Sequence, residues 1–457
     1  MKFDYVCIGA GIASLMFSYR IRQRYPDASV AILEKGKRLE ERSCPLDNRT
    51  VSRCIHCKQC AIVSGVAGSG AKNDGKYIIP TVDSADYGGW LAEYIGAEPL
   101  IDLVKQLDGI LTGFADKEYP FYSPSFEFKA ECLKYDLHLK TAYIRHYGSD
   151  GNFRVMSKLV EYLEREGVNI FTEVGIKDID LSKKEITSTA GSFEYNKLVI
   201  AVGRNGTPWF VDFCRLNRIE LESNKVDIGV RVEIPSAICK QVSETMYEPK
   251  IYYRTKQYGD IVRSFCWNNN DAKVCIENND KVLSVNGYSN SSSNELSGNS
   301  NFALLASINF SQPFKQPTEY ARYIASLSNM ISGNSVLVQR LGDLKLGRRT
   351  NEHRLSQSTT IPTLKTAVAG DISLAMPKRI LDDIIETLDA MNNVMMGISN
   401  YDTLLYSPEI KTYSAKPKFI SENFDISEDV YCCGDCSGTT RSLSQAGAQG
   451  LYIADRI

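Results

Sequence analysis

Two glycines and an acidic residue near the start of the chain have the spacing of a dinucleotide-binding turn. Gly9-x-Gly11-x-x-Ser14 follows the apolar residues 3–8, and Glu34 comes twenty residues after Ser14. Gly9 would let the backbone turn sharply, Gly11 would let a pyrophosphate approach it, and Ser14 stands where a third small residue is usual. A helix that begins here would offer free N–H groups and the positive end of its dipole to the phosphates. Glu34 would then accept hydrogen bonds from the hydroxyl groups of a ribose.

A glycine and an acid also stand together near the other end of the chain. Gly434 and Asp435 follow the apolar residues 430–433 and precede the small residues of 441–450. The carboxylate can bind the ribitol hydroxyls of a flavin, and the N-terminus of a helix over 441–450 can stabilise negative charge on the flavin ring. A Gly-Asp turn by itself is common in loops, and the first motif alone does not separate FAD from NAD. Together the two chain ends favour FAD.

Residue periodicity predicts the elements that position these two ends. A strand, a helix and a strand over 3–8, 11–24 and 29–34 form one βαβ unit, and 430–457 forms a last strand and helix. The further expected elements are helices over 89–108, 155–163, 317–333 and 378–398, strands over 168–171, 175–180, 184–188, 191–195 and 197–203, a β-rich segment over 226–310, a long loop over 37–90, and a polar loop or lid over 286–301.

The expected fold class is α/β. It combines a Rossmann-like, three-layer ββα domain for FAD, discontinuous in the chain, with a β-rich (α+β) substrate or cap domain. A chain of 457 residues is too long for a single core. The expected FAD-binding domain takes residues 1–90, 150–205 and 365–457, and the substrate domain takes 91–149 and 206–364. The substrate is expected where the flavin ring meets the β-rich domain.

Further motifs along the chain match a known family. They are Cys44-Pro45, Cys54-x-x-Cys57-x-x-Cys60, Gly65-x-x-Gly68-x-Gly70 with Asp74-Gly75-Lys76, the run from Val226 to Arg231, the run from Tyr406 to Lys411, and Gly434-Asp435. With them the chain resembles the FAD-dependent oxidoreductases that have a glutathione-reductase-like FAD domain, and most closely the "NAD(FAD)-utilizing dehydrogenase" family. These motifs span nearly the whole chain. The resemblance implies FAD as the cofactor and names no substrate.

The resemblance also adds to the expected cofactor contacts. It implies a backbone contact with adenine at Val174 and a small-residue turn beside the dinucleotide at Ala201 and Gly203, although Arg204 to Gly206 depart from the usual pattern. The full set of expected cofactor-binding residues is Gly9, Ala10, Gly11, Ile12, Ala13, Ser14, Glu34, Lys35, Arg42, Val174, Ala201, Gly203, Gly434, Asp435, Gln445, Ala446 and Gly447.

Four cysteines lie close together in the loop over 37–90. Cys44, Cys54, Cys57 and Cys60 could ligate an iron–sulfur cluster or a zinc ion, or could relay electrons to the flavin as a dithiol. The plain alternative is a set of reduced thiols in a loop over the cofactor. Thirteen cysteines with no recognised secretory signal indicate a reducing cytosol, so the chain is expected to be cytoplasmic.

No residue stands out as a general acid or base. Lys76 could lie near the flavin or the pyrophosphate, and Arg441 could stabilise a reduced, anionic flavin, so both are candidate catalytic residues. Arg348 and Arg349 could clamp a carboxylate substrate or form a surface charge pair. The four histidines have no metal-binding spacing. Hydride transfer depends on geometry more than on a strong base.

Composition narrows the classes of function. The net charge of −2 gives no basic surface for nucleic acid or membrane, and no apolar run reaches the ~20 residues of a membrane helix. No second glycine fingerprint occurs between 150 and 365, which argues against a tightly bound nicotinamide. The expected function is an FAD-dependent oxidoreductase, a dehydrogenase or reductase that transfers a hydride between flavin N5 and a small organic substrate. The alternatives are an electron-transfer protein that uses the Cys44–Cys60 cluster with a partner, and a non-catalytic FAD-binding partner module.

Overall fold

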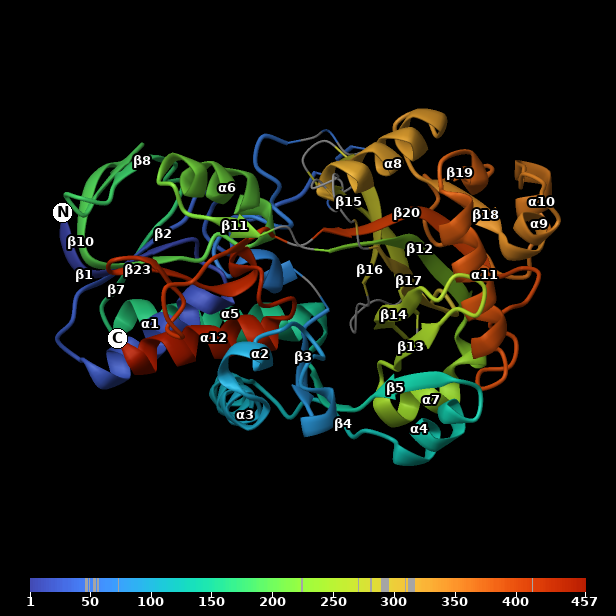
Figure 1. Ribbon diagram of the computed structural model, residues 1–457, viewed down its shortest axis with the longest axis horizontal. Coiled ribbons are helices and arrows are strands. Elements are labelled where there is room, and N and C mark those ends of the chain that lie inside the picture. The colour runs from blue at the N-terminus through green and yellow to red at the C-terminus, as the bar shows by residue number, and fades with distance from the viewer. Residues whose placement is uncertain are drawn as a thin grey trace. The chain divides into compact units, whose positions relative to one another are not determined.

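The first strand of the chain lies in the middle of a parallel sheet. In the computed structural model, β1 (Lys2–Ile8) pairs in parallel with β2 (Val30–Leu33) on one side and β10 (Gly191–Ile200) on the other. β7 (Val168–Phe171) and β23 (Val430–Cys432) extend the sheet in parallel, and β22 (Asp425–Ser427) adds an antiparallel edge. In the order β22-β23-β10-β1-β2-β7, a single strand separates the last parallel strand of the chain from the first (Figure 1).

Both faces of this sheet are buried. Tyr5 and Cys7 of β1 belong to the core on one face, whereas Val6 and Ile8 belong to the core on the other. Because the side chains of a strand alternate between its faces, an unbroken apolar strand needs cover on both sides. The expected βαβ unit over 3–36 is confirmed.

A helical layer covers one face and a β-meander covers the other, as the three-layer ββα prediction requires. Their members are α1 (Ile12–Arg24), α5 (Gly148–Arg165) and α12 (Leu443–Arg456) on the first face, and β8 (Ile176–Asp180), β9 (Glu185–Ser188), the N-terminal half of β10 and α6 (Thr207–Leu216) on the second.

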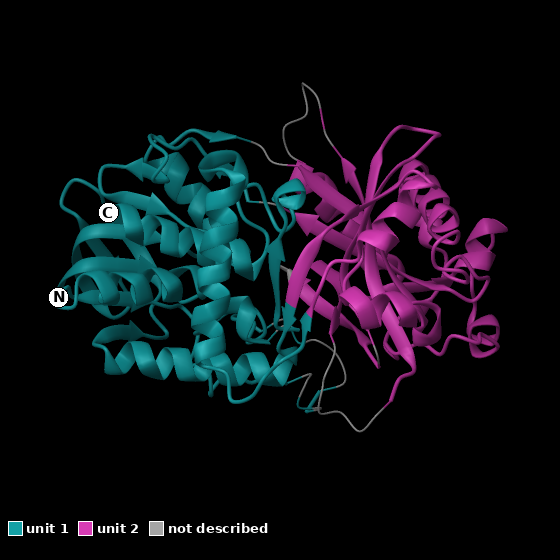
Figure 2. Cartoon of the chain, turned by 90° about the horizontal axis from the view of Figure 1, so that it is seen from below, with its two compact units in different colours: residues 1–121, 145–224, 414–457 teal, residues 122–144, 225–413 magenta. Residues whose placement is uncertain are grey.

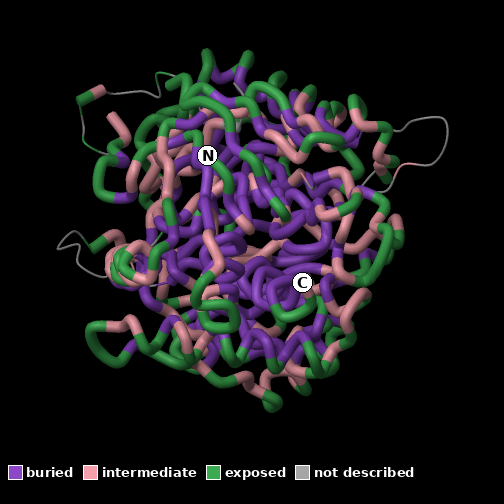
Figure 3. Tube along the Cα trace, turned by 90° about the vertical axis from the view of Figure 1, so that its left-hand side faces the viewer, coloured by how far each residue is buried: buried purple, intermediate pink, exposed green. Residues whose placement is uncertain are grey.

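The last helix packs closely against the first. A Cβ atom added to Gly450 of α12 would lie 2.2 Å from the carbonyl oxygen of Ala13 in α1. A Cβ atom added to Gly447 would lie 2.9 Å from the side chain of Leu107. α12 is therefore buried over most of its length, close to the C-terminus marked in Figure 3. Small residues on α12 allow this close approach.

The structure describes residues 1–457 except 46, 47, 49, 52–54, 56, 73, 223, 224, 270, 280, 281, 289–295, 309, 311–316 and 413. The chain divides into two compact units (Figure 2). Unit 1 consists of Met1–Phe121, Arg145–Asn224 and Ser414–Ile457, and unit 2 consists of Tyr122–Ile144 and Lys225–Tyr413. The sheet containing β1 belongs to unit 1.

The unit boundaries differ from the predicted domain boundaries on both sides. The sequence analysis assigns 91–149 to the substrate domain, whereas α3 (Ala97–Gly113) lies in unit 1, because its apolar face joins the same core as α12. It assigns 365–457 to the FAD domain, whereas α11 (Lys378–Met391) and β20 (Leu404–Thr412) lie in unit 2. α11 packs into the second core, and β20 pairs with β12 (Val226–Pro235).

Unit 2 is built on an eight-stranded sheet in the order β19-β18-β20-β12-β17-β14-β13-β5. The strands and helices of this unit are α4 (Phe126–Leu133), β5 (Leu137–Lys140), β12, α7 (Lys240–Met246), β13 (Lys250–Arg254), β14 (Ile261–Asn268), β15 (Lys273–Asn279), β16 (Val282–Tyr288), β17 (Asn299–Ile308), α8 (Pro317–Ile331), β18 (Leu337–Arg340), α9 (Leu341–Lys345), α10 (Glu352–Ser356), β19 (Val368–Ala369), α11 and β20. The expected β-rich (α+β) character is confirmed.

The central strand β12 buries charged residues as well as apolar ones. Ile228 and Val230 face the apolar core, while the alternate side chain of Arg231 pairs with Glu409 at 3.1 Å, and both of these side chains are fully buried. The hairpin of β15 and β16 packs its own apolar residues over this polar face. Buried charges persist only when they are paired and hydrogen-bonded, and here the carboxylate meets that requirement.

Three sequence expectations meet a different local structure. The expected helix over 89–108 is broken at Gly96 (φ 88°), which separates α2 (Ala92–Ile95) from α3. The expected loop over 37–90 contains the 3-10 helix η1 (Gly68–Lys72) and β3 (Lys76–Pro80). The polar loop or lid over 286–301 includes the end of β16 and the start of β17, and its residues 289–295 lie outside the described part of the chain.

The remaining strands are short. β4 (Phe121–Tyr122), β6 (Ala142–His146) and β3 form a sheet in the order β3-β6-β4, and β11 (Leu221–Glu222) pairs with β21 (Lys416–Pro417). Within the described ranges, no helix is long and apolar enough to cross a membrane.

The contact between α1 and α12 predicts opposite effects for two helical glycines. Gly450→Ala should lower the stability of the protein by roughly 1–3 kcal/mol, because its methyl group meets backbone that can move only by separating the helices. Gly109→Ala is the matched control, because Gly109 is exposed on α3 and no described atom lies within 4 Å of its added Cβ. It should raise stability by about 0.5–1 kcal/mol. Thermal melting of the two variants checks both signs, and equal shifts would contradict the close packing.

Candidate cofactor site

The turn between β1 and α1 leaves backbone open on one side. Gly9 has φ 94°, and a Cβ atom there would lie 2.5 Å from the carbonyl oxygen of Ala201, so only glycine fits. Gly11 is the N-cap of α1, and no described atom lies within 4 Å of a Cβ added to it. No described side chain caps α1. The N–H groups of its first turn, at Ile12 to Ser14, are therefore available to an anion.

A buried carboxylate joins this turn to two others. Glu34 is 6% exposed, and its Oε2 accepts a hydrogen bond from the N–H of Ala10 at 2.9 Å. Its Oε1 accepts from Gly36 at 2.8 Å and from Gly65 at 3.0 Å. A carboxylate offers about four lone-pair sites, so, as far as the described residues are concerned, one acceptor position remains on Oε2. Glu34 can thus hold the loops and still bind a ribose hydroxyl.

Two neighbouring residues of the predicted set lie beside Glu34 in different ways. The N–H of Val174 donates to the backbone carbonyl of Glu34 at 2.9 Å, so the segment after β7 that would line adenine lies next to the ribose site. Lys35 is exposed, and its contact with the cofactor stays a prediction. Ala201 and Gly203 (φ 62°) form the turn after β10 that abuts Gly9.

Arg42 holds the second glycine-rich loop in place. Its guanidinium donates to the backbone carbonyls of Ala61, Ile62, Val66 and Gly68, at 3.0, 2.8, 2.8 and 2.7 Å. Burial lowers the pKa of Arg42 to about 10, while the charge of Glu34 opposes that shift. Four of its five N–H donors are used by backbone, so Arg42 acts on the loop, and its own contact with the cofactor stays a prediction.

The glycine-rich loop reaches the N-terminus of α1. A Cβ atom on Gly68 would lie 3.1 Å from the Cα of Gly11. Gly70 lies against Leu443 of α12, with its added Cβ 2.8 Å from that side chain. Residues 65–70 therefore connect the start of α1 to the start of α12.

The C-terminal motif lies against the N-terminal one. The N–H of Gly434 (φ 73°) donates to Oε1 of Gln449 at 2.8 Å, and a Cβ atom on Gly434 would lie 3.0 Å from the Cβ of Ala13. The two chain ends therefore lie side by side, with β1 and β23 in one sheet, and their joint binding of FAD stays a prediction.

Asp435 is a largely buried acid with two described partners. Its Oδ1 accepts from Thr440 Oγ1 at 2.8 Å, and its Oδ2 lies 3.3 Å from Nε of Arg204. Burial raises the pKa of Asp435, and Arg204, Thr440 and Arg441 oppose that shift. Sequence reasoning noted Arg204 only as a departure from the usual pattern. No spacing rule links it to a residue more than two hundred positions away.

The start of α12 is ordered by side chains of unit 1. Ser442 caps the helix by accepting from the N–H of Gln445 at 3.2 Å. The side-chain amide of Gln445 donates to the carbonyl of Ala85 at 3.1 Å, so this amide fixes the loop before α2. Arg441 lies over the ring of Trp90, 4.1 Å from its centroid. Ala446 follows on the same helix and is buried, as is Gly447. Flavin contacts of these residues stay predictions.

The arrangement fits FAD on several independent features. An open backbone turn and an uncapped helix suit the pyrophosphate, Glu34 retains an acceptor for ribose, and Asp435 is a carboxylate at the position expected for ribitol. When bound, FAD would supply the hydride and electron chemistry.

Lys76 lies in a cluster with an acid and a histidine. Asp74 is buried, and its Oδ2 lies 3.5 Å from Nζ of Lys76. Its Oδ1 lies 3.0 Å from Nε2 of His146 at the end of β6. Sequence reasoning named Lys76 but missed His146. Neither its type nor its spacing gave a signal, because it stands seventy residues from Lys76 in the chain.

The four-cysteine hypothesis remains a prediction. Cys44 and Cys60 are half-buried and Cys57 is exposed, whereas Cys54 lies outside the described residues. Within the part of the chain that the structure describes, no three His, Cys, Asp or Glu side chains are grouped to hold a metal ion. At the other cysteine-rich site, the thiols of Cys432 and Cys436 are buried 3.8 Å apart, and burial raises the pKa of Cys432 well above its usual value.

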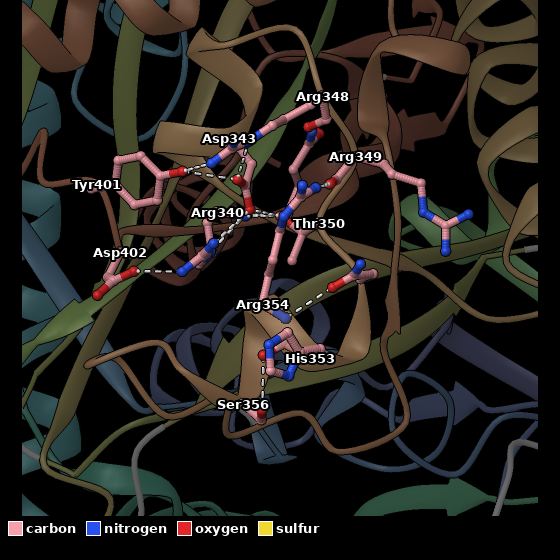
Figure 4. Close-up of polar contacts among 12 residues, drawn as sticks. Arg340, Asp343, Arg348, Arg349, Thr350, His353, Arg354, Ser356, Tyr401 and Asp402 are labelled. Atoms are coloured by element: carbon pink, nitrogen blue, oxygen red, sulfur yellow. Dashed lines mark hydrogen bonds and ion pairs between the residues drawn. The ribbon is translucent and has the colours of Figure 1, made fainter.

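The basic pair Arg348-Arg349 of unit 2 does not form a clamp. Arg348 donates to Asp343 Oδ1 at 2.9 Å and to the hydroxyl of Tyr401, whereas Arg349 points away from this cluster (Figure 4). Burial of Asp343 opposes its ionisation, but hydrogen bonds from Arg340, Thr350, Arg348 and Tyr401 outweigh burial and lower its pKa to about 2. The charge of Arg348 is thus used to neutralise a buried acid.

The family comparison covers the second unit. Residues 225–412 match the family model described as "FAD-dependent protein, C-terminal domain-like". This span coincides with the long segment of unit 2, Lys225–Tyr413. The match covers less than half of the chain, and it supports an FAD-dependent protein, with FAD as the cofactor and oxidoreduction as the type of chemistry. It does not confirm the narrower "NAD(FAD)-utilizing dehydrogenase" family.

Solved structures with a similar fold are distant. Glycine oxidase from Geobacillus kaustophilus is 10% identical, with 99% of this chain and 94% of that chain covered and a TM-score of 0.42. Quinol fumarate reductase of E. coli is 10% identical, with 100% and 70% covered and a TM-score of 0.44. A flavoprotein/dehydrogenase from Cytophaga hutchinsonii is 14% identical, with 99% and 75% covered and a TM-score of 0.38. A search among curated proteins finds no match. Likenesses at this level do not identify a substrate.

Removal of the Glu34 carboxylate should weaken FAD binding. Glu34→Ala loses an acceptor for ribose, and it also removes the carboxylate that accepts hydrogen bonds from the N–H groups of Ala10, Gly36 and Gly65. A hydrogen bond to a charged group contributes about 1.5–3 kcal/mol, which corresponds to a loss of roughly 10- to 100-fold in affinity. Glu428→Ala, an exposed acid of the same unit, is the control. Equal retention of flavin by both variants after gel filtration would contradict this role.

The burial of Asp435 predicts a pH-dependent difference in stability. Because burial raises its pKa in the folded protein, ionisation of Asp435 costs stability as the pH rises through that folded-state pKa. Asp435→Asn cannot ionise, so the FAD-free variant should gain stability over the FAD-free parent as the pH rises, and should lose that gain in acid. Melting temperatures across pH measure the difference. A difference that is constant with pH, or that grows in acid, would show that Arg204 outweighs burial.

Proposed function

We propose that this chain is an FAD-dependent oxidoreductase in which unit 1 holds FAD and a hydride passes between flavin N5 and a small organic substrate. The buried carboxylate of Glu34 is the observation that best supports the proposal. It stands beside an open glycine turn and an uncapped helix, and it retains an acceptor position. The family match over residues 225–412 supports it independently, because it concerns a different unit.

The proposed roles follow from the contacts within unit 1. Backbone N–H groups of Ile12 to Ser14 bind the pyrophosphate, and Glu34 binds the adenosine ribose. Asp435 binds the ribitol chain, and its ion pair with Arg204 favours the charged form of the carboxyl, against the effect of burial. The start of α12 provides a positive potential for negative charge on the flavin ring.

The finer parts of the proposal are the hydride step and the kind of substrate. The distant solved structures include oxidases and dehydrogenases of amino acids, and we infer no particular substrate from them. The two alternatives, an electron-transfer protein built on the Cys44–Cys60 cluster and a non-catalytic FAD-binding module, have no described contact in their favour.

Anaerobic spectroscopy of the purified protein tests the proposal. The protein should contain FAD, and its flavin absorption should bleach with at least one donor among NADH, NADPH, amino acids and hydroxy acids, and should return on admission of air or an artificial acceptor. Dithionite gives the spectrum of full reduction as a reference. A chain that neither contains FAD nor takes it up after refolding would overturn the proposal.

The same preparation separates the alternatives. Iron with acid-labile sulfide in metal analysis would favour the electron-transfer protein. Flavin that dithionite reduces, and that every organic donor leaves oxidised, would favour the binding module.

A further inference from the structure

The loop after β10 lies against two other loops at the predicted cofactor site. The carbonyl oxygen of Ala201 lies so close to Gly9 that a Cβ atom on this glycine would come within 2.5 Å of it. Later in the loop, Nδ2 of Asn205 donates to Oγ of Ser64 at 2.9 Å, just before the glycine-rich loop begins at Gly65. The backbone between Ala201 and Asn205 is therefore held at both ends.

Arg204 stands on this loop between the two parts of unit 1 that the proposed function assigns to FAD. It begins the 3-10 helix η3 (Arg204–Gly206), and the start of its loop abuts the turn at Gly9 that would bind the pyrophosphate. Its Nε lies 3.3 Å from Oδ2 of Asp435, the acid that would bind the ribitol chain. In FAD one phosphate is joined directly to the ribitol. If the two assignments are right, this phosphate lies between the groups on either side of Arg204.

The contact with Asp435 uses only one edge of the guanidinium. An arginine has five N–H donors, and the donor on Nε faces the carboxylate. The N–H groups on the two Nη atoms make no hydrogen bond or ion pair with any residue that the structure describes. The side chain is 51% exposed, so a ligand can reach these donors. Arg204 can thus hold Asp435 and bind an anion at the same time.

The turn that would bind the pyrophosphate has no basic side chain of its own. Residues 9–14 contain no Lys, Arg or His. The N-terminus of α1 supplies about half of one positive charge, whereas each phosphate of the pyrophosphate carries a negative charge. Arg42 already donates to four backbone carbonyls. A guanidinium binds phosphate well, because its planar fork matches two phosphate oxygens.

We propose that Arg204 is a cofactor-binding residue whose Nη groups bind the FAD phosphate nearest the ribitol, while its Nε holds Asp435 in place for the ribitol hydroxyls. The inference rests on the proposed function. One guanidinium then contacts both sides of the bond between ribitol and phosphate. It adds the positive charge that the end of α1 does not supply. The site therefore selects a phosphorylated flavin over riboflavin.

Dilution of the purified holoprotein tests the phosphate contact, with flavin fluorescence as the measure of release. Arg204→Gln removes the charge and the fork, and it should weaken FAD binding by about 10- to 100-fold. Arg204→Lys keeps the charge and loses the fork, so its affinity should lie between those of the parent and Arg204→Gln. Arg215→Gln is the matched control. It changes an exposed arginine of α6 that pairs with Asp212, and it should bind FAD as the parent does.

A double-variant cycle separates a phosphate contact from an effect that acts only through Asp435. FAD binding is compared in the parent, Arg204→Gln, Asp435→Asn and the double variant. If Arg204 binds the phosphate, Arg204→Gln should weaken FAD binding in the Asp435→Asn background as well. If the double variant binds FAD as tightly as Asp435→Asn alone, Arg204 only positions the acid and the proposal is overturned.

The possible outcomes also separate this inference from the proposed function. A parent protein that neither contains FAD nor takes it up refutes both. An Arg204→Gln variant that binds FAD as tightly as the parent refutes the role of Arg204 and leaves the proposed function intact. If Arg204→Gln does not fold, Arg204→Lys replaces it in the cycle. Equal affinities of Arg204→Lys and the parent would overturn the forked contact in either case.

Discussion

The carboxylate of Glu34 is the contact on which the nucleotide-binding half of unit 1 depends. It binds N–H groups from three separate turns, at Ala10, Gly36 and Gly65. A buried N–H group without a partner costs about 1–3 kcal/mol, so three such groups would not stay together without an acceptor. One side chain therefore brings the glycine turn of α1, the end of β2 and the long loop to a single point. Any ribose that reaches this point meets an acceptor whose position is already fixed.

The charged side chain of Arg42 holds the rest of that long loop in place by hydrogen bonds. The loop from Ala61 to Gly70 consists mainly of small residues, which offer little apolar area to bury. Arg42 compensates by donating to four of its carbonyls, and the charge of Glu34 nearby favours the ionised guanidinium. Charge-assisted hydrogen bonds thus replace packing where backbone must stay exposed to a ligand. Unit 2 also contains buried carboxylates that are paired with arginines: Glu409 with Arg231, and Asp343 with Arg348.

Residue periodicity and turn residues correctly predicted those elements that depend on neighbouring residues in the chain. The strand, turn, helix and acid from Lys2 to Glu34 follow from periodicity and glycine chemistry, and so do the last strand and helix. The domain boundaries were wrong where a helix joins a core made by distant residues, as α3 joins α12. The partners of single charges were also missed. Arg204 beside Asp435 and His146 beside Asp74 are contacts between residues that are far apart in the chain, and a single sequence does not reveal them. The sequence left open whether Arg348 and Arg349 clamp a substrate or form a surface charge pair, and it did not reveal that Arg348 pairs with the buried Asp343 of α9.

The interleaved course of the chain has a consequence for biosynthesis. The sheet of unit 1 receives β23, and its helical layer receives α12, only from the segment Ser414–Ile457, which the ribosome makes after the whole of unit 2. Domains fold as units, and the earlier ones begin during translation. Unit 1, however, cannot complete its fold before α12 has been made. Until then α1 lacks the helix that packs against it, and the incomplete unit exposes apolar surface. The nascent chain is therefore expected to need chaperones until α12 has emerged, and to bind its cofactor only afterwards.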